Sequence, residues 1–401
     1  MARGTRTYLR ACVLSWMLAG CADVLGLAPA DPIPNVCVTD RDCPPDWRCS
    51  NSQCISNTCA TPGQNQCNGL ELFSCGMDGK WKPNPQKCAS RCEIDACVAA
   101  PSCELMDQCA GVSCCDSIQV GQEHFELSYA VPAQVGDKLE YRPRSVPRSI
   151  RPYALDRFEV TLGRFNVFVA HYETARSPQP GAGKHPAFAD SGWQESWNDA
   201  GGPLPQNIGD LTKSLIARGE RLPTDSSDQK LPVRGVSWYL AAAFCIWDGG
   251  RLPTEAEWAF AASGGDSREF PWGADADPPN APDRAVYTGD GVTHDGPLPV
   301  GEHPSGRGPL GHEDMAGNVQ EWVADVYTTT LPATCHGASD ATLDQFECLQ
   351  RGTDGADRVL RGGAYENQAS LLSNLRRGSK APQEAERDFG IRCARDLPVT
   401  R

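Results

Sequence analysis

Cysteine content most limits how this chain can fold, because 14 of the 20 cysteines in its 401 residues fall between Cys37 and Cys115. Their spacings are irregular and no Cys-x-x-Cys pair occurs, which disfavours a zinc or iron–sulfur site. Apolar residues are sparse here, so seven disulfides are expected to replace a hydrophobic core. The sequence leaves the pairing open, although the adjacent Cys114 and Cys115 are expected to have different partners. Residues 37–115 are therefore a predicted disulfide-rich module that serves as a stalk, a spacer or a binding module.

The N-terminus has the organisation of a bacterial export signal. Three arginines fall within the first ten residues, and the apolar stretch that follows is too short to cross a bilayer. The sequence LAGC then resembles a lipobox, in which Cys21 becomes the acylated first residue of a lipoprotein. We therefore expect residues 1–20 to be a lipoprotein signal peptide and residues 21–36, rich in Pro and Ala, to be a lipidated tether. Ordinary secretion with cleavage nearby is the alternative.

This signal predicts an extracytoplasmic protein that is anchored by lipid to the cell envelope. Ala22, rather than Asp, follows the acylated cysteine, which favours the outer membrane in bacteria that use that sorting rule. The formal net charge is −14, from 37 basic and 51 acidic residues. A surface of this charge disfavours binding to nucleic acid. No nucleic-acid partner is expected.

Beyond the cysteine-rich window the pattern changes to that of a mixed α+β domain. Alternation over residues 123–130 predicts a strand. Thr161, Ser237 and Thr254 each precede a predicted helix, and the sequence TEAE at the third site fits a capping box. The long stretch 264–312 is rich in Gly, Pro and Asp and predicts loop. These residues together predict an irregular, loop-rich α+β fold.

Four sequence blocks then resemble the formylglycine-generating enzyme family, also called sulfatase-modifying factors. They are GGRLPTEAEW (249–258), DMAGNVQEW (314–322), RVLRGGAYEN (358–367) and FGIRCARD (389–396). The blocks occur in the order that the family shows. The resemblance implies a compact domain akin to C-type lectins, with little regular secondary structure, over residues 117–400.

Members of this family oxidise a substrate cysteine to formylglycine with a copper ion held by two cysteines. Aligned to the RGG block, this chain has Asn367 and Leu372 at those two positions. Amide and alkyl groups do not replace the thiolates that hold Cu(I). The resemblance therefore implies the scaffold without the copper, and the expected function is a non-catalytic module that binds an unknown protein, peptide or glycan.

The alternative is a divergent oxidoreductase of the same family, or of its non-haem iron relatives, that modifies a protein or a small molecule. An iron site would have to draw on His294, His303 and His312, which lie in Pro- and Gly-rich loop without close pair spacing. Iron is therefore the less favoured metal. No nucleophile elbow or phosphate-binding loop occurs either.

The block DMAGNVQEW carries a calcium site in the family. The resemblance implies that Asp314 and Glu321 supply side-chain oxygens and that Gly317 and Val319 supply backbone carbonyls to a structural Ca²⁺ ion. Mixed carboxylate and carbonyl sets suit this ion. The alternative is a Gly-Asn turn before a strand, with solvated carboxylates.

Two disulfides are expected in the domain. Cys245 and Cys393 match two cysteines that pair in the family, and Cys335 and Cys348 are then left to close a local loop. A second family bridge is absent, because its positions are Ala262 and Arg377 in this chain.

Tyr365 in the RGG block is expected to lie at a possible ligand groove together with Arg376 and Arg377. Arg376, Arg377 and Lys380 form a basic cluster there, which suits an acidic or peptide ligand, although it also suits a solvated face.

Overall fold

The computed structural model describes parts of the chain between residues 47 and 397. From residue 100 onward the description is continuous except for residues 104–107, 136–137, 200, 219–227, 274–282, 289–293 and 336–345. The expected signal peptide, Cys21 and the tether lie outside the described residues. Within the described parts, no helix is long and apolar enough to cross a membrane. The chain divides into two units, residues 1–58 and 59–401.

The described residues of the cysteine-rich region form short antiparallel sheets. In the first unit, β1 (Trp47–Ser50) pairs with β2 (Gln53–Ser56). In the second unit, β3 (Asn65–Asn68), β4 (Glu71–Cys75) and β5 (Trp81–Lys87) form one sheet. Two further pairs are β6 (Arg91–Glu93) with β7 (Ala96–Val98), and β8 (Gln108–Cys109) with β9 (Val112–Ser113). Disulfides join Cys103 to Cys115 and Cys109 to Cys114, so the two adjacent cysteines do have different partners.

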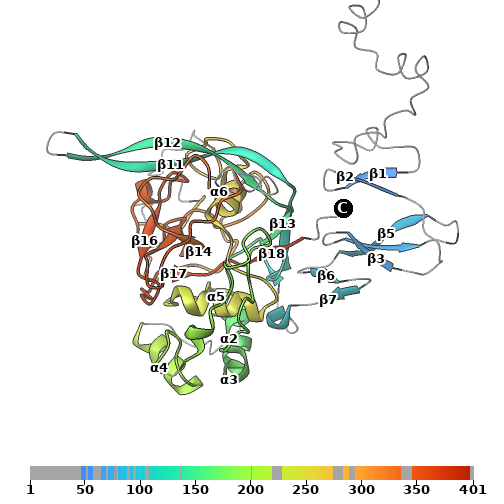
Figure 1. Ribbon diagram of the computed structural model, residues 1–401, viewed down its shortest axis with the longest axis horizontal. Helices are drawn as coiled ribbons and strands as arrows, with labels where there is room; N and C mark the ends of the chain where they lie inside the picture. Colours follow the sequence, from blue (N-terminus) through green and yellow to red (C-terminus); the bar gives the residue numbers. More distant parts are fainter. Residues whose placement is uncertain are drawn as a thin grey trace, which may run out of the picture. The chain divides into compact units, whose positions relative to one another are not determined.

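Two small sheets organise the C-terminal domain (Figure 1). One has the order β10 (Ser117–Val120), β13 (Tyr153–Asp156) and β18 (Ala394–Asp396), and it joins the two ends of the domain. The other has the order β16 (Gly378–Lys380), β15 (Arg358–Arg361), β14 (Gln320–Val326) and β17 (Phe389–Gly390). The pair β14 and β17 is parallel, and the other pairs in these two sheets are antiparallel.

The helices are short and begin at side-chain caps. They are α2 (Leu162–Ala170), α3 (Tyr172–Ala175), α4 (Ile208–Ala217), α5 (Trp238–Trp247) and α6 (Glu255–Ser263), with 3-10 turns η2 (Pro101–Cys103), η3 (Glu195–Asn198), η4 (Asp228–Lys230), η6 (Pro304–Gly306) and η7 (Ala369–Leu371). Thr161, Ser237 and Thr254 cap their helices as predicted, and Thr254 forms the predicted capping box with Glu257. Every residue of α6 is buried, so this helix belongs to the core and not to the surface. The irregular α+β, loop-rich fold is confirmed.

A long hairpin lies against this domain. Its strands, β11 (Glu123–Val135) and β12 (Lys138–Ile150), are paired along their whole length. Leu127, Val146 and Ile150 near its base pack into the same apolar cluster as Trp258 of α6. The outer half of the hairpin continues beyond this contact (Figure 1).

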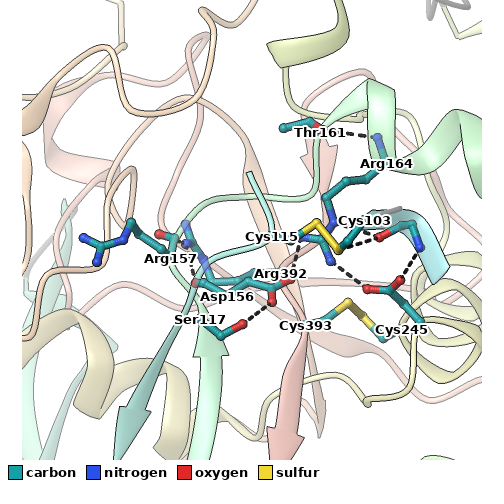
Figure 2. Close-up of polar contacts among 12 residues, drawn as sticks. Cys103, Cys115, Ser117, Asp156, Arg157, Thr161, Arg164, Cys245, Arg392 and Cys393 are labelled. Carbon is teal, nitrogen blue, oxygen red and sulfur yellow. Dashed lines mark hydrogen bonds and ion pairs between the residues drawn. A yellow bond between two sulfur atoms is a disulfide. The ribbon is translucent and has the colours of Figure 1, made fainter. Parts of the chain in front are cut away.

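A ring of four buried charges closes the domain around its ends. Arg164 donates to Asp156 and Asp248 at 2.8 and 2.7 Å, and Arg395 donates to the same two carboxylates. Figure 2 shows the half of this ring formed by Asp156 and Arg164, with Ser117 donating to Asp156. Burial alone would raise the pKa of Asp156, but the two neighbouring guanidiniums hold it below its ordinary value. Each carboxylate is therefore compensated by two cations.

The two predicted disulfides of the domain are present. Cys245 in α5 bonds to Cys393 beside β18, and Cys335 bonds to Cys348. The first bridge is fully buried and joins residues 148 apart, whereas the second joins residues 13 apart.

Replacing Cys245 and Cys393 by Ala should therefore destabilise the protein more than replacing Cys335 and Cys348 by Ala. Loop-closure entropy gives a loss of about 5 kcal/mol for the first pair and about 3 kcal/mol for the second. Urea unfolding of the two double variants under non-reducing conditions measures the difference. A larger loss from the local bridge would contradict this expectation.

Candidate functional site

A strained turn over residues 314–319 leads into β14. Asp314 and Asn318 have positive φ values of 57° and 61°, which non-glycine residues rarely adopt. At Gly317, with φ of 85°, an added Cβ would lie 2.4 Å from the carbonyl oxygen of Val286. Each such residue costs on the order of 1–3 kcal/mol and persists where the surroundings fix it, often at functional sites.

Glu159 fixes this turn from the other side of the domain. Its buried carboxylate accepts from the side-chain nitrogen of Asn318 at 2.6 Å and from the backbone N–H of Val319 at 3.0 Å. The sequence analysis missed this residue. The available signal is an acidic residue between two apolar residues, Phe158 and Val160, in the segment that joins β13 to α2.

Two further carboxyl groups are buried beside Glu159. Glu321 accepts from Trp258 Nε1 at 2.6 Å and from Arg392 Nη2 at 2.7 Å, and Asp314 accepts from the N–H of Gly301 at 2.7 Å. Burial raises the pKa of Asp314 to about 7. Burial, followed by the charges of Asp314 and Glu321, raises the pKa of Glu159 well above its ordinary range. Three carboxyl groups are thus buried close together, and only Glu321 of the three is paired with a guanidinium.

A groove of about 230 Å³ opens beside β15. It is lined by Gln320, Leu360, Arg361, Gly362, Gly363, Asn367, Leu371, Arg376, Arg377 and Gly378. The hairpin flanks it, because Ala130 donates to the carbonyl of Leu375 at 2.7 Å and the Arg376 guanidinium lies 3.4 Å from the centre of the Tyr141 ring. Burial lowers the pKa of Arg361 in this wall to about 10.

Residues 116–397 match the family described as the Sulfatase-modifying factor enzyme 1-like domain. The chain belongs to this sulfatase-modifying factor family. It is 33% identical to the formylglycine-generating enzyme of Streptomyces coelicolor over 265 residues, which cover 63% of this chain and 80% of that protein. It is 34% identical to the formylglycine-generating enzyme of Bos taurus over 181 residues, covering 42% of this chain and 45% of that one. It is 31% identical to the hercynine oxygenase of Mycobacterium tuberculosis over 216 residues, covering 52% and 46%.

The chain therefore spans most of the Streptomyces relative but less than half of the other two proteins.

Positions 367 and 372, where the sequence resemblance places the two copper-binding cysteines, carry structural side chains here. Asn367 lines the groove, and its side-chain oxygen accepts from the N–H of Ala364 at 2.9 Å. Leu372 is 1% exposed and packs in an apolar cluster with Phe270 and Tyr287. Neither side chain is a soft ligand, so these residues do not fit a copper ion.

Arg377, one of the two positions expected to lack the second family bridge, forms a buried ion pair instead. Arg377 donates to both oxygens of Glu255, at 2.6 and 2.8 Å. Glu255 begins α6, the helix that also contains Ala262. An ion pair therefore links α6 to the segment just before β16 in this chain. Arg377 of the expected basic cluster forms this ion pair, and Arg376 stacks on Tyr141 of the hairpin.

Tyr365 lies outside the lining of the groove. It is 2% exposed, and its hydroxyl accepts from Arg234 Nη1 at 2.8 Å. Burial raises its pKa to about 12. Tyr365 therefore supports the chain behind the RGG block, while Arg376 and Arg377 line the groove itself.

The expected calcium ligands are brought together only in part. Asp314, Gly317, Val319 and Glu321 all lie in or directly after the strained turn, but Glu321 is already held by Arg392 and Trp258. In the part of the chain that the structure describes, no group of three or more His, Cys, Asp or Glu side chains is placed to hold a metal ion. The four expected ligands comprise two carboxylates and two backbone carbonyls.

Asp325 is a further buried acid next to the Arg377–Glu255 pair. It accepts from the backbone N–H groups of Glu255 and Gln350 at 2.7 and 2.9 Å. Burial, followed by the charge of Glu255, raises its pKa to about 7. Because the folded chain binds this proton more tightly than the unfolded chain, the stabilisation is present at low pH and is lost as pH rises through about 7.

The pH dependence of stability should therefore change in Asp325→Asn, which cannot titrate. Between pH 5 and 7 the wild-type free energy of unfolding should fall more steeply than that of the variant, by up to about 1.4 kcal/mol per pH unit. Denaturant unfolding across this range measures both slopes. Asp357→Asn, at an exposed carboxyl group, is the matched control and should keep the wild-type slope. Equal slopes in the wild type and Asp325→Asn would contradict the assignment.

Proposed function

We propose that this chain is a lipid-anchored protein of the bacterial cell envelope whose C-terminal domain binds a ligand without copper-dependent oxidation. An export signal ending in LAGC supports the anchor. Four disulfides among the described residues support a location outside the cytoplasm. The ligand is a protein, a peptide or a glycan.

The replacement of the copper ligands is the observation that carries this proposal. Leu372 is part of a packed apolar cluster and Asn367 is part of a hydrogen-bonded turn, so each side chain has a structural role. A groove lies beside Asn367, with Arg361 and Arg376 in its wall. A groove without thiolate ligands favours binding over copper-dependent oxidation.

A divergent oxidoreductase is the second candidate, and the identity with hercynine oxygenase supports it. Such an enzyme needs donors other than the family cysteines. Burial lowers the pKa of His312 to about 3, so this imidazole is neutral at physiological pH. Metal analysis of the purified protein separates the two candidates, because stoichiometric iron or copper favours the enzyme and calcium alone favours the binding module.

We also propose that a structural calcium ion binds at the turn through Asp314, Gly317, Val319 and Glu321. The cluster of Glu159, Asp314 and Glu321 supports it, because buried carboxyl groups are the oxygen donors that Ca²⁺ prefers and the ion would replace protons on them. The strained backbone of the turn supports it as well.

If calcium binds there, chelation should lower the melting temperature of the wild type and leave that of Asp314→Ala unchanged. Alanine also strains a backbone at φ of 57°, so the comparison uses the shift caused by chelator and not the absolute melting temperature. Asp357→Ala, at an exposed carboxyl group, should respond to chelator as the wild type does. Equal melting of the wild type with and without chelator would count against the calcium site.

Lipid attachment is tested by Cys21→Ser. The wild type should partition with membranes, whereas the variant should be released as soluble protein because serine cannot receive the thioether-linked lipid. Fractionation followed by immunoblotting measures this. A variant that stays in the membrane fraction would show that Cys21 is not the anchor.

No formylglycine should form when the copper-loaded protein is incubated with a reduced Cys-x-Pro-x-Arg peptide, which is the substrate type that the family suggests. Mass spectrometry should show the peptide cysteine unchanged. The double change Asn367→Cys and Leu372→Cys should raise the affinity for Cu(I), because it restores two thiolates at the family spacing. Turnover by the unmodified protein would overturn the proposal that this domain is not a copper oxidase.

A further inference from the structure

A second pocket lies on a different part of the domain. It has a volume of about 310 Å³ and shares no lining residue with the groove. Residues 190–197, the first residue of α5 and residues 349–358 form its walls. Neither the copper positions nor the proposed calcium ligands line it.

Two buried hydrogen-bond donors in its walls lack a partner. Trp197 is 8% exposed, and its indole N–H donates to no group of the described chain. Arg358 donates from Nη1 to Ala324 and stacks over Trp238 at 3.9 Å, but its Nε–H also has no partner. A buried donor without an acceptor costs about 1–3 kcal/mol. By contrast, the indole N–H groups of four other buried tryptophans donate within the protein: Trp193, Trp238, Trp258 and Trp322.

The charges around the pocket cancel. Asp190 and Asp354 face Arg351 and Arg358 in the lining. Arg351 is bound to Asp190 and lies over the ring of Phe188. An anionic ligand would have to compete with Asp190 for this arginine, and a cationic ligand would have to compete with Arg351 for this carboxylate. The pocket therefore favours a neutral ligand that supplies hydrogen-bond acceptors.

The volume and the polar lining of the pocket further restrict the kind of ligand that it can bind. Since one water occupies about 30 Å³ of the liquid, the pocket has room for roughly ten waters, and thus for one sugar ring. Gln194 and Gln350 add planar amides, which both donate and accept, to the same walls. We propose that this pocket binds one neutral sugar unit, whose hydroxyl oxygens accept from Trp197 and Arg358.

The proposal does not depend on whether the groove is catalytic, because the two pockets share no wall. A free monosaccharide and the terminal unit of a glycan present the same hydroxyl chemistry. The rival explanation is a single water bound to the indole of Trp197, because a cavity of about 30 Å³ adjoins the same tryptophan.

Saturation-transfer NMR on the purified full-length protein tests the proposal. The probes are glucose, galactose, mannose and N-acetylglucosamine in the millimolar range, and then an array of neutral and sialylated glycans, which separates free sugars from glycan termini. At least one neutral sugar should bind. Trp197→Phe, which keeps an aromatic side chain but removes the N–H, should weaken that binding at least tenfold, which is about 1.4 kcal/mol.

Two further variants test whether a change in sugar binding comes from this pocket. Trp247→Phe is the matched control, since Trp247 packs in the core without lining this pocket, and it should bind as the wild type does. Asp354→Asn, at the exposed rim, should also weaken binding and is not expected to disturb folding. Absence of binding to every neutral sugar, a preference for charged sugars, or binding unchanged in both Trp197→Phe and Asp354→Asn would each overturn the proposal.

Discussion

The ring of Asp156, Arg164, Asp248 and Arg395 is the interaction on which the rest of this domain depends. Removing four charges from water costs several kcal/mol per ion, and the cost is offset only while every charge keeps its partners. Ser102 completes the ring, since its N–H donates to Asp248 at 2.9 Å and its hydroxyl accepts from Arg164 at 3.0 Å. The Cys103–Cys115 disulfide lies directly after this serine (Figure 2). The end of the cysteine-rich module is therefore a structural part of the domain that follows it.

The sequence predicted the helix caps, whose partners lie close together in the chain. It did not predict which buried charged groups pair across long sequence distances. The caps at Thr161, Ser237 and Thr254 involve residues three positions apart, so a single sequence shows both partners. The bridges Cys245–Cys393 and Cys335–Cys348 were expected because the family resemblance named one pair and left the other. By contrast, the hydrogen bond from Asn318 to Glu159 joins residues 159 apart. Nothing in the local pattern around an isolated acid indicates which distant turn it holds.

The sequence also did not predict the long-range contacts of the residues around the groove. The sequence placed Tyr365, Arg376 and Arg377 together because they follow one motif. In the fold, Tyr365 turns into the interior to meet Arg234, and Arg377 turns to Glu255, so they have separate roles. The pocket around Trp197 left no sequence signal, because its walls come from separate segments, at residues 190–197, 238, 324 and 349–358, that carry no shared motif.

The four family blocks are joined to one another by hydrogen bonds that do not involve the expected copper positions. Trp258 in the first block donates to Glu321 in the second, and Arg392 in the fourth block donates to the same carboxylate. The third block joins them, since Gly317 donates to the carbonyl of Gly362 at 3.0 Å. None of these contacts involves Asn367 or Leu372. The resemblance therefore accounts for the fold, and a shared fold does not by itself imply a shared activity.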